Sequence, residues 1–192
     1  MNEFEFRERL KENIQTKLRN DKYEIKMNEN LIYKVIINEN LQFEPNKPEN
    51  PKRGSYAFQT DLLIIRKDKQ IPLVVIETKY GGFSTHDVLT YSTKAQKHKE
   101  VYPYLRYGLV VGGTNKITNK FFIHNIGFDF AIALKKINDN AINELIEIVR
   151  CQIKSAESIL EIFKDKNQTK SFTTQITIKK LNGEEKNEAT KR

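Results

Sequence analysis

The sequence has one cysteine among its 192 residues and no run of about 20 apolar residues. A lone cysteine cannot form an internal disulfide, which fits a reducing compartment. Cys151 falls in a helical apolar pattern, so we interpret it as core or interface packing rather than as a nucleophile. The lack of a long apolar run argues against a membrane span, and the acidic, amphipathic N-terminal stretch is unlike a signal peptide. We therefore expect a cytoplasmic protein with no membrane partner.

The chain also lacks the Cys/His spacing of a zinc site, the pattern of a helix-turn-helix and any internal repeat. Its length suits one domain, which we place over residues 1–170. Residues 171–181 are predicted to add an edge strand, and residues 182–192 form a mixed-charge tail. Lys and Arg total 33 against 25 Asp and Glu, a net charge of +8. Binding to a phosphate backbone needs such a surplus, although the surplus alone does not establish it.

The stretch from Tyr56 to Tyr80 organises the chain. Two apolar runs rich in Ile, Val and aromatic residues flank a short charged link, a pattern that predicts a β-hairpin. Both runs are nearly all apolar, so the strands are expected to be buried on both faces. Asp61, Glu77 and Lys79 interrupt this apolar wall. Buried charges are costly unless they are paired or bind a metal, so we expect these three side chains to form ion pairs or to bind a metal.

Strand geometry favours a metal site. Side chains alternate along a strand, so Glu77 and Lys79 share a face and Thr78 points away. Folding the hairpin sets Asp61 opposite a position between Val75 and Glu77, and opposed residues have Cβ atoms about 5 Å apart. The two carboxylates can then hold one divalent cation near Lys79. Hard carboxylate oxygens suit Mg²⁺, which takes further oxygens from water or phosphate. The pattern outlines a phosphodiester-hydrolysing site.

Asp61, a spacer and then Glu77-Thr78-Lys79 after a hydrophobic strand resemble the motif of the PD-(D/E)xK nuclease superfamily. Thr60 stands where the motif has proline. The resemblance implies an α/β, restriction-endonuclease-like three-layer fold, with a mixed central β-sheet flanked by helices. It also implies one or two Mg²⁺ ions held by Asp61, Glu77 and the backbone carbonyl of Thr78. Lys79 would act on the attacking water, and the DNA product would carry a 5′-phosphate.

An apolar residue recurs every four positions over residues 2–20, which predicts a helix. Superfamily members often bring a further glutamate from the first helix towards the metal. Glu8 and Glu12 are the candidates here, and Glu12 suits the family register slightly better. A solvent-facing position for both glutamates is the alternative.

A second helix is predicted to begin at Ser84 or Thr85 and to end near Val101. In the superfamily this helix flanks the cleft and often presents a basic or amide side chain to the DNA phosphate. Lys94 and Gln96 are the candidates for that contact, and a solvated charged face is the alternative.

Further strands and one long helix complete the expected fold. A helix separates the strand over Leu105–Gly113 from the Glu77 strand, so the two are expected to be parallel. The remaining elements are predicted from apolar patterns: strands over Tyr23–Met27, Leu31–Ile37 and Phe128–Leu134, a polar loop over 39–54, and a helix over 138–164 whose apolar seam suits the sheet or a subunit interface.

Within the superfamily the chain looks most like a type II restriction endonuclease acting on double-stranded DNA. The motif core takes up nearly the whole chain, leaving little for sequence recognition. Either loop 39–55 reads bases in a homodimer, or a large partner subunit reads the site. The second arrangement resembles the small, strand-nicking subunit of heterodimeric type IIS enzymes. A repair or junction nuclease of the same fold and a non-catalytic nucleic-acid-binding domain are the other possibilities.

Overall fold

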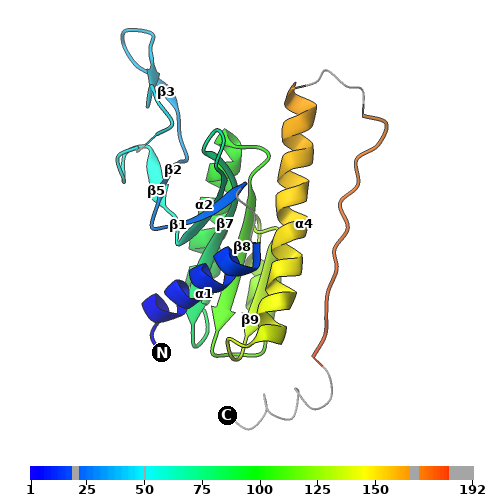
Figure 1. Ribbon diagram of the computed structural model, residues 1–192. Helices are drawn as coiled ribbons and strands as arrows, with labels where there is room; N and C mark the ends of the chain where they lie inside the picture. Colours follow the sequence, from blue (N-terminus) through cyan, green and yellow to red (C-terminus); the bar gives the residue numbers. More distant parts are fainter. Residues whose placement is uncertain (19–21, 50, 165–168, 182–192) are drawn as a thin grey trace.

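A mixed five-stranded sheet forms the centre of the computed structural model (Figure 1). The structure describes residues 1–18, 22–49, 51–164 and 169–181. The first three strands are antiparallel and the last two run parallel to the third, as the intervening helix predicts. In sheet order the strands are β1 (Tyr23–Met27), β6 (Leu62–Arg66), β7 (Ile71–Tyr80), β8 (Arg106–Gly112) and β9 (Phe130–Leu134).

Helices flank both faces of this sheet (Figure 1). One face packs against α1 (Glu3–Leu18) and α4 (Asp139–Lys164). The other packs against α2 (Thr85–Val101) and the short α3 (Asn119–His124). Every residue of β6 is buried, which confirms that this strand lies in the middle of a covered sheet. The predicted α/β class and mixed central sheet are therefore correct.

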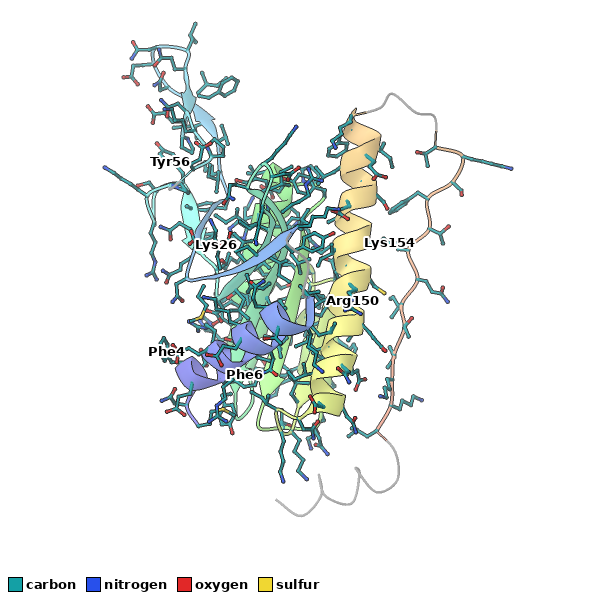
Figure 2. All side chains as sticks on the ribbon, viewed as in Figure 1. Phe4, Phe6, Lys26, Tyr56, Arg150 and Lys154 are labelled. Atoms are coloured by element: carbon teal, nitrogen blue, oxygen red, sulfur yellow. The ribbon has the colours of Figure 1, made fainter. Side chains whose placement is uncertain are left out.

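Two short antiparallel ribbons form an arm that stands away from the sheet and carries Tyr56 (Figure 2). Each ribbon pairs an early segment with a later one: β2 (Asn30–Ile32) with β5 (Ala57–Gln59), and β3 (Ile36–Ile37) with β4 (Phe43–Glu44). The strand predicted over Leu31–Ile37 is thus split, and the predicted loop contains β4. Apolar content alone did not reveal that these residues leave the central sheet.

Three other expectations differ from the structure. Cys151 lies exposed on α4, so the core alternative is wrong and the interface alternative stays a prediction. Residues 169–181, as described, contain no strand, and Phe172, Ile176 and Ile178 are exposed. The predicted edge strand over 171–181 is therefore wrong: β-branched residues favour a strand, but a strand also needs a neighbouring edge to pair with. The tail over 182–192 lies outside the described residues. No described helix combines the length and apolarity of a membrane span.

Candidate active site

Asp61 lies where the chain crosses from the arm into the central sheet. Just before it, buried Thr60 donates its backbone N–H and its hydroxyl to the carbonyl of Glu29, at 2.8 and 3.1 Å. The first run of the hairpin, predicted as continuous, is therefore broken at this point. Leu62 pairs with Ile76, so Asp61 comes opposite Glu77 itself. The sequence prediction had placed Asp61 between Val75 and Glu77, within one residue of this position.

The Asp61 carboxylate joins three elements. Its Oδ2 accepts hydrogen bonds from the backbone N–H and the hydroxyl of Thr78, both at 2.8 Å. Its Oδ1 lies 2.8 Å from a guanidinium nitrogen of Arg7 on α1. Arg7 also donates to the Thr78 hydroxyl at 3.3 Å and to the Asn28 side chain at 3.0 Å. The Asp61 carboxylate thus accepts the Thr78 N–H of β7 in place of a backbone carbonyl, and it also pairs with the guanidinium of Arg7.

Glu77 is held from the opposite face of the sheet. Its side chain is 1% exposed, and Oε1 accepts hydrogen bonds from Lys94 Nζ at 2.7 Å and from the Tyr107 hydroxyl at 2.6 Å. Burial raises the pKa of Glu77; Lys94 opposes this rise, and the charge of Asp61 adds to it. Asp61 is thus held from the α1 side and Glu77 from the α2 side, and the charge of Asp61 still acts on Glu77. We call Asp61 and Glu77 the acid pair.

Lys79 shares the α2 face of the sheet with Glu77, as alternation predicts. Its ammonium lies 3.4 Å from Asp87, 3.6 Å from Glu3 and 5.4 Å from the centre of the Tyr91 ring. Burial lowers the pKa of Lys79, but Tyr91, Glu3 and Asp87 together raise it above its ordinary value. Lys79 is therefore an ammonium at neutral pH, suited to offsetting negative charge.

Ion pairs divide the site into two groups. One chain of contacts runs from Asp61 through Arg7, Glu3 and Lys79 to Asp87. The other group is the buried contact of Lys94 with Glu77. Together the two groups contain four carboxylates and three cations, which leaves one negative charge in excess when all are ionised.

The structure separates the remaining candidates. Lys94 points from α2 to the acid pair, whereas Gln96 is exposed. Two residues along a helix correspond to a rotation of about 200°, so these side chains face nearly opposite sides of α2. On α1, Glu3 and Arg7 reach the site while Glu8 and Glu12 are exposed. The predicted contribution of Glu12 to the metal has no support from this geometry, and the predicted contact of Gln96 with the DNA phosphate stays a prediction.

The acid pair fits the chemistry of Mg²⁺. Mg²⁺ is commonly bound through one or two carboxylates and completed by water and substrate phosphate oxygens. Within the described ranges, no three His, Cys, Asp or Glu side chains come together in a way that could hold a metal ion. The two carboxylates alone would not complete the coordination of a metal ion, which would need further oxygens such as the carbonyl of Thr78 or oxygens from outside the chain. In this structure Arg7 and Lys94 neutralise the pair.

Sequence reasoning missed Arg7, Glu3 and Tyr107. A buried tyrosine hydroxyl needs a hydrogen-bond partner, so Tyr107 in a strand next to the Glu77 strand was a usable signal. Arg7 and Glu3 lie one turn apart on α1, and locally they look like any exposed i,i+4 pair. Their role depends on how α1 crosses the sheet, which no local pattern encodes.

No protein-family model matches this chain, and no curated protein matches its sequence. Function is therefore inferred from the chemistry of the site.

Proposed function

We propose that this protein is a Mg²⁺-dependent DNA endonuclease with a restriction-endonuclease-like fold. The observation that carries the proposal is the pairing of Leu62 with Ile76, the residues next to Asp61 and Glu77, which brings the two carboxylates to the same end of neighbouring strands. Lys79 follows two residues later on the same face as Glu77. Two opposed carboxylates with a nearby ammonium form a constellation suited to activating water against a phosphodiester.

Each residue has a distinct task in this proposal. Asp61, Glu77 and the carbonyl of Thr78 would hold the metal, which when bound acidifies a water molecule and offsets charge on the phosphate. Lys79 orients the attacking water and stabilises the negative charge that develops on the phosphate oxygens. Because its pKa is raised, Lys79 acts as a cation rather than as a base. Asp87 and Glu3 hold its ammonium in place.

The partner is double-stranded DNA, which the net charge of +8 favours. One such site cuts one strand, so double-strand cleavage requires a second site. The chain would then act as a type II restriction endonuclease, either as a homodimer or as the nicking subunit beside a large recognition subunit. Incubating the purified chain alone with short duplexes separates the two arrangements. Specific cutting of both strands would exclude dependence on a large recognition subunit.

Plasmid nicking tests the assignment directly. With Mg²⁺ present, Asp61→Ala, Glu77→Ala and Lys79→Ala should each slow nicking by at least about 10³-fold while DNA binding is largely retained. Lys97→Ala is the matched control, since Lys97 is an exposed lysine of α2 that pairs with Glu100. Mapping the ends should reveal 5′-phosphates. Full activity in any of the three variants would refute the assignment.

The ion pairs also suit a second candidate, a non-catalytic domain that binds nucleic acid. In that case Arg7 and Lys94 are permanent partners of the acid pair, and the carboxylates have a structural role alone. Affinity for DNA would fall steeply with salt in both cases, so salt dependence does not separate them. Nicking that requires Mg²⁺ favours the nuclease, and DNA binding without such nicking favours the binding domain.

A further inference from the structure

The ammonium of Lys94 lies between two oxygen acceptors. It lies 2.7 Å from Glu77 Oε1 and also donates to the backbone carbonyl of Gln59, the residue two before Asp61. Carboxylate and backbone carbonyl oxygens are the ligands that Mg²⁺ and Ca²⁺ take from proteins. The Lys94 side chain is 12% exposed, so its ammonium and the two oxygen atoms that it contacts are largely shielded from water.

A divalent cation at the acid pair would lie beside this ammonium. Lys94 and Tyr107 both donate to Oε1 of Glu77, and a dication at Oε2 of the same carboxylate would repel the Lys94 ammonium. Asp61 is neutralised separately by Arg7, which Asn28 and Thr78 also hold in place. Lys94 is therefore the cation more easily exchanged. Its flexible four-carbon stem allows the ammonium to move while the helix stays in place.

The Tyr91 ring lies close to the ammonium groups of both Lys94 and Lys79. Its centre lies 5.7 Å from Lys94 Nζ and 5.4 Å from Lys79 Nζ, within the range of a cation–π contact for both. Moving from Glu77 towards this ring, Lys94 would join Lys79 on the α2 side of the site. Two ammonium groups there would attract a DNA phosphate.

We propose that Lys94 and a divalent cation compete for the Glu77 carboxylate, so that metal binding releases Lys94 towards the substrate phosphate. The role of the released lysine rests on the proposed nuclease function, but the competition itself does not. Because coupling between two ligands is reciprocal, DNA that draws Lys94 away from Glu77 also tightens metal binding. The site then loads its metal preferentially when DNA is present.

Manganese binding to the full chain tests the exchange without reference to cleavage. Lys94→Met removes the competing charge and should tighten Mn²⁺ binding by about tenfold, measured by calorimetry or from the spin resonance of unbound Mn²⁺. Lys97→Met on the exposed face of α2 and Lys99→Met at a different ion pair should leave the affinity unchanged. An unchanged or weaker affinity in Lys94→Met would overturn the proposal.

A second measurement uses the wild-type chain and does not depend on how well any variant folds. Acetylation of individual lysines, followed by mass spectrometry, reports how accessible each amine is. Saturating Mn²⁺ should raise the acetylation rate of Lys94 severalfold and leave that of Lys97 unchanged. A Lys94 rate that does not respond to Mn²⁺ would count against release of the ammonium.

Failure of the exchange can be told apart from failure of the nuclease assignment. If the wild type nicks DNA with Mg²⁺ but Lys94→Met binds Mn²⁺ no more tightly, the exchange is wrong and the nuclease stands. If the wild type does not nick DNA yet Lys94→Met binds Mn²⁺ more tightly, the exchange stands and the nuclease is wrong. No Mn²⁺ binding by either protein refutes the exchange.

Discussion

Two lysines of α2, Lys94 and Lys99, each form an ion pair with a carboxylate at the central sheet, and the two contacts are nearly alike. Lys94 bridges Glu77 and a backbone carbonyl. Lys99 bridges Asp129, at 2.7 Å, and the carbonyl of Gly127, at 2.6 Å. In each case the ammonium is largely buried and has one charged and one neutral acceptor. The lysine contact alone therefore does not distinguish a structural ion pair from a candidate metal site.

The surroundings of the two carboxylates distinguish them. The charge of a second carboxylate, Asp61, helps to raise the pKa of Glu77. Asp129 instead has a second cation, Arg106, at 3.5 Å, and its Oδ2 accepts a hydrogen bond from the Tyr107 backbone N–H at 2.7 Å. Asp129 is thus fully compensated and is 21% exposed. With Arg7 and Lys94 counted, the acid pair is neutral, whereas Asp129 with Lys99 and Arg106 carries one extra positive charge. A dication would therefore be repelled less at the acid pair than at Asp129.

The largest expected difference between the two sites is in catalysis. Glu77→Gln keeps the size of the side chain but removes its charge, and should slow plasmid nicking by at least about 10³-fold. Asp129→Asn should leave the nicking rate nearly unchanged, because Asp129 touches no proposed reacting group. Both rates need to be compared in proteins whose circular dichroism shows a native fold. Equal losses in the two variants would mean that charge at Glu77 has no special role.

Removing each lysine should separate the sites by stability. Lys94→Met leaves Glu77 buried and without a cation, which should cost about 3 kcal/mol in the free energy of unfolding at neutral pH. Lys99→Met should cost about 1 kcal/mol, because Asp129 keeps Arg106 and is partly solvated. Urea unfolding measures both. Losses of equal size would show that the two ion pairs are energetically equivalent.

The stability loss in Lys94→Met should also depend on pH. Burial raises the pKa of Glu77, and loss of Lys94 removes the cation that opposes this rise. Folded Glu77 then keeps a proton that the unfolded chain has lost, so the free energy of unfolding falls as pH rises through that window. Lowering the pH from about 7 to about 5 should recover part of the loss in Lys94→Met. Lys99→Met should recover less, and identical pH profiles would contradict the assignment.

Gly127→Ala should damage the Asp129 site and spare the acid pair. A Cβ at Gly127 would lie 2.3 Å from the carbonyl oxygen of Ser92 and 2.9 Å from the backbone nitrogen of Gln96, both on α2. Backbone atoms of a helix cannot move aside cheaply, so we expect a cost of about 2 kcal/mol. Thermal unfolding measures this loss, and Mn²⁺ affinity should stay unchanged. A variant as stable as the wild type would show that α2 and the Gly127 turn can separate without penalty.

The contrast between the two sites shows what the sequence could predict. Alternation along a strand placed Glu77 and Lys79 on one face, and the hairpin brought Asp61 within one residue of its position. The cap of α2 was also readable, because Ser84 and Asp87 form a reciprocal pair of hydrogen bonds. These features depend on periods of two residues or on neighbours within one helical turn.

What could not be predicted depends on how distant elements pack. The sequence left open whether Glu8 or Glu12 of α1 reaches the metal or whether both face solvent. Both are exposed, and the crossing of α1 over the sheet brings Arg7 and Glu3 to the site instead. Lys94 and Gln96 were equivalent in sequence, and the rotation of α2 against the sheet separates them. Each of the carboxylates Asp61, Glu77 and Asp129 pairs with a cation at least 17 residues away in the sequence. Local sequence patterns therefore could not predict how fully its charge is neutralised.

The smallest expected effect comes from Tyr107, which touches both sites through different atoms. Its backbone N–H donates a hydrogen bond to Asp129, and its hydroxyl donates one to Glu77. Tyr107→Phe therefore removes the contact with Glu77 and keeps the contact with Asp129. The ring retains its stacking on His98, and we expect a loss of about 1 kcal/mol in urea unfolding. Because the hydroxyl stabilises ionised Glu77, its removal should raise the pKa of Glu77 further and steepen the fall of stability with pH.

Combining Tyr107→Phe with Glu77→Gln should cost less than the sum of the two single losses, whereas with Asp129→Asn the losses should simply add. Additive losses in both combinations would show that the hydroxyl contributes nothing specific to the acid pair.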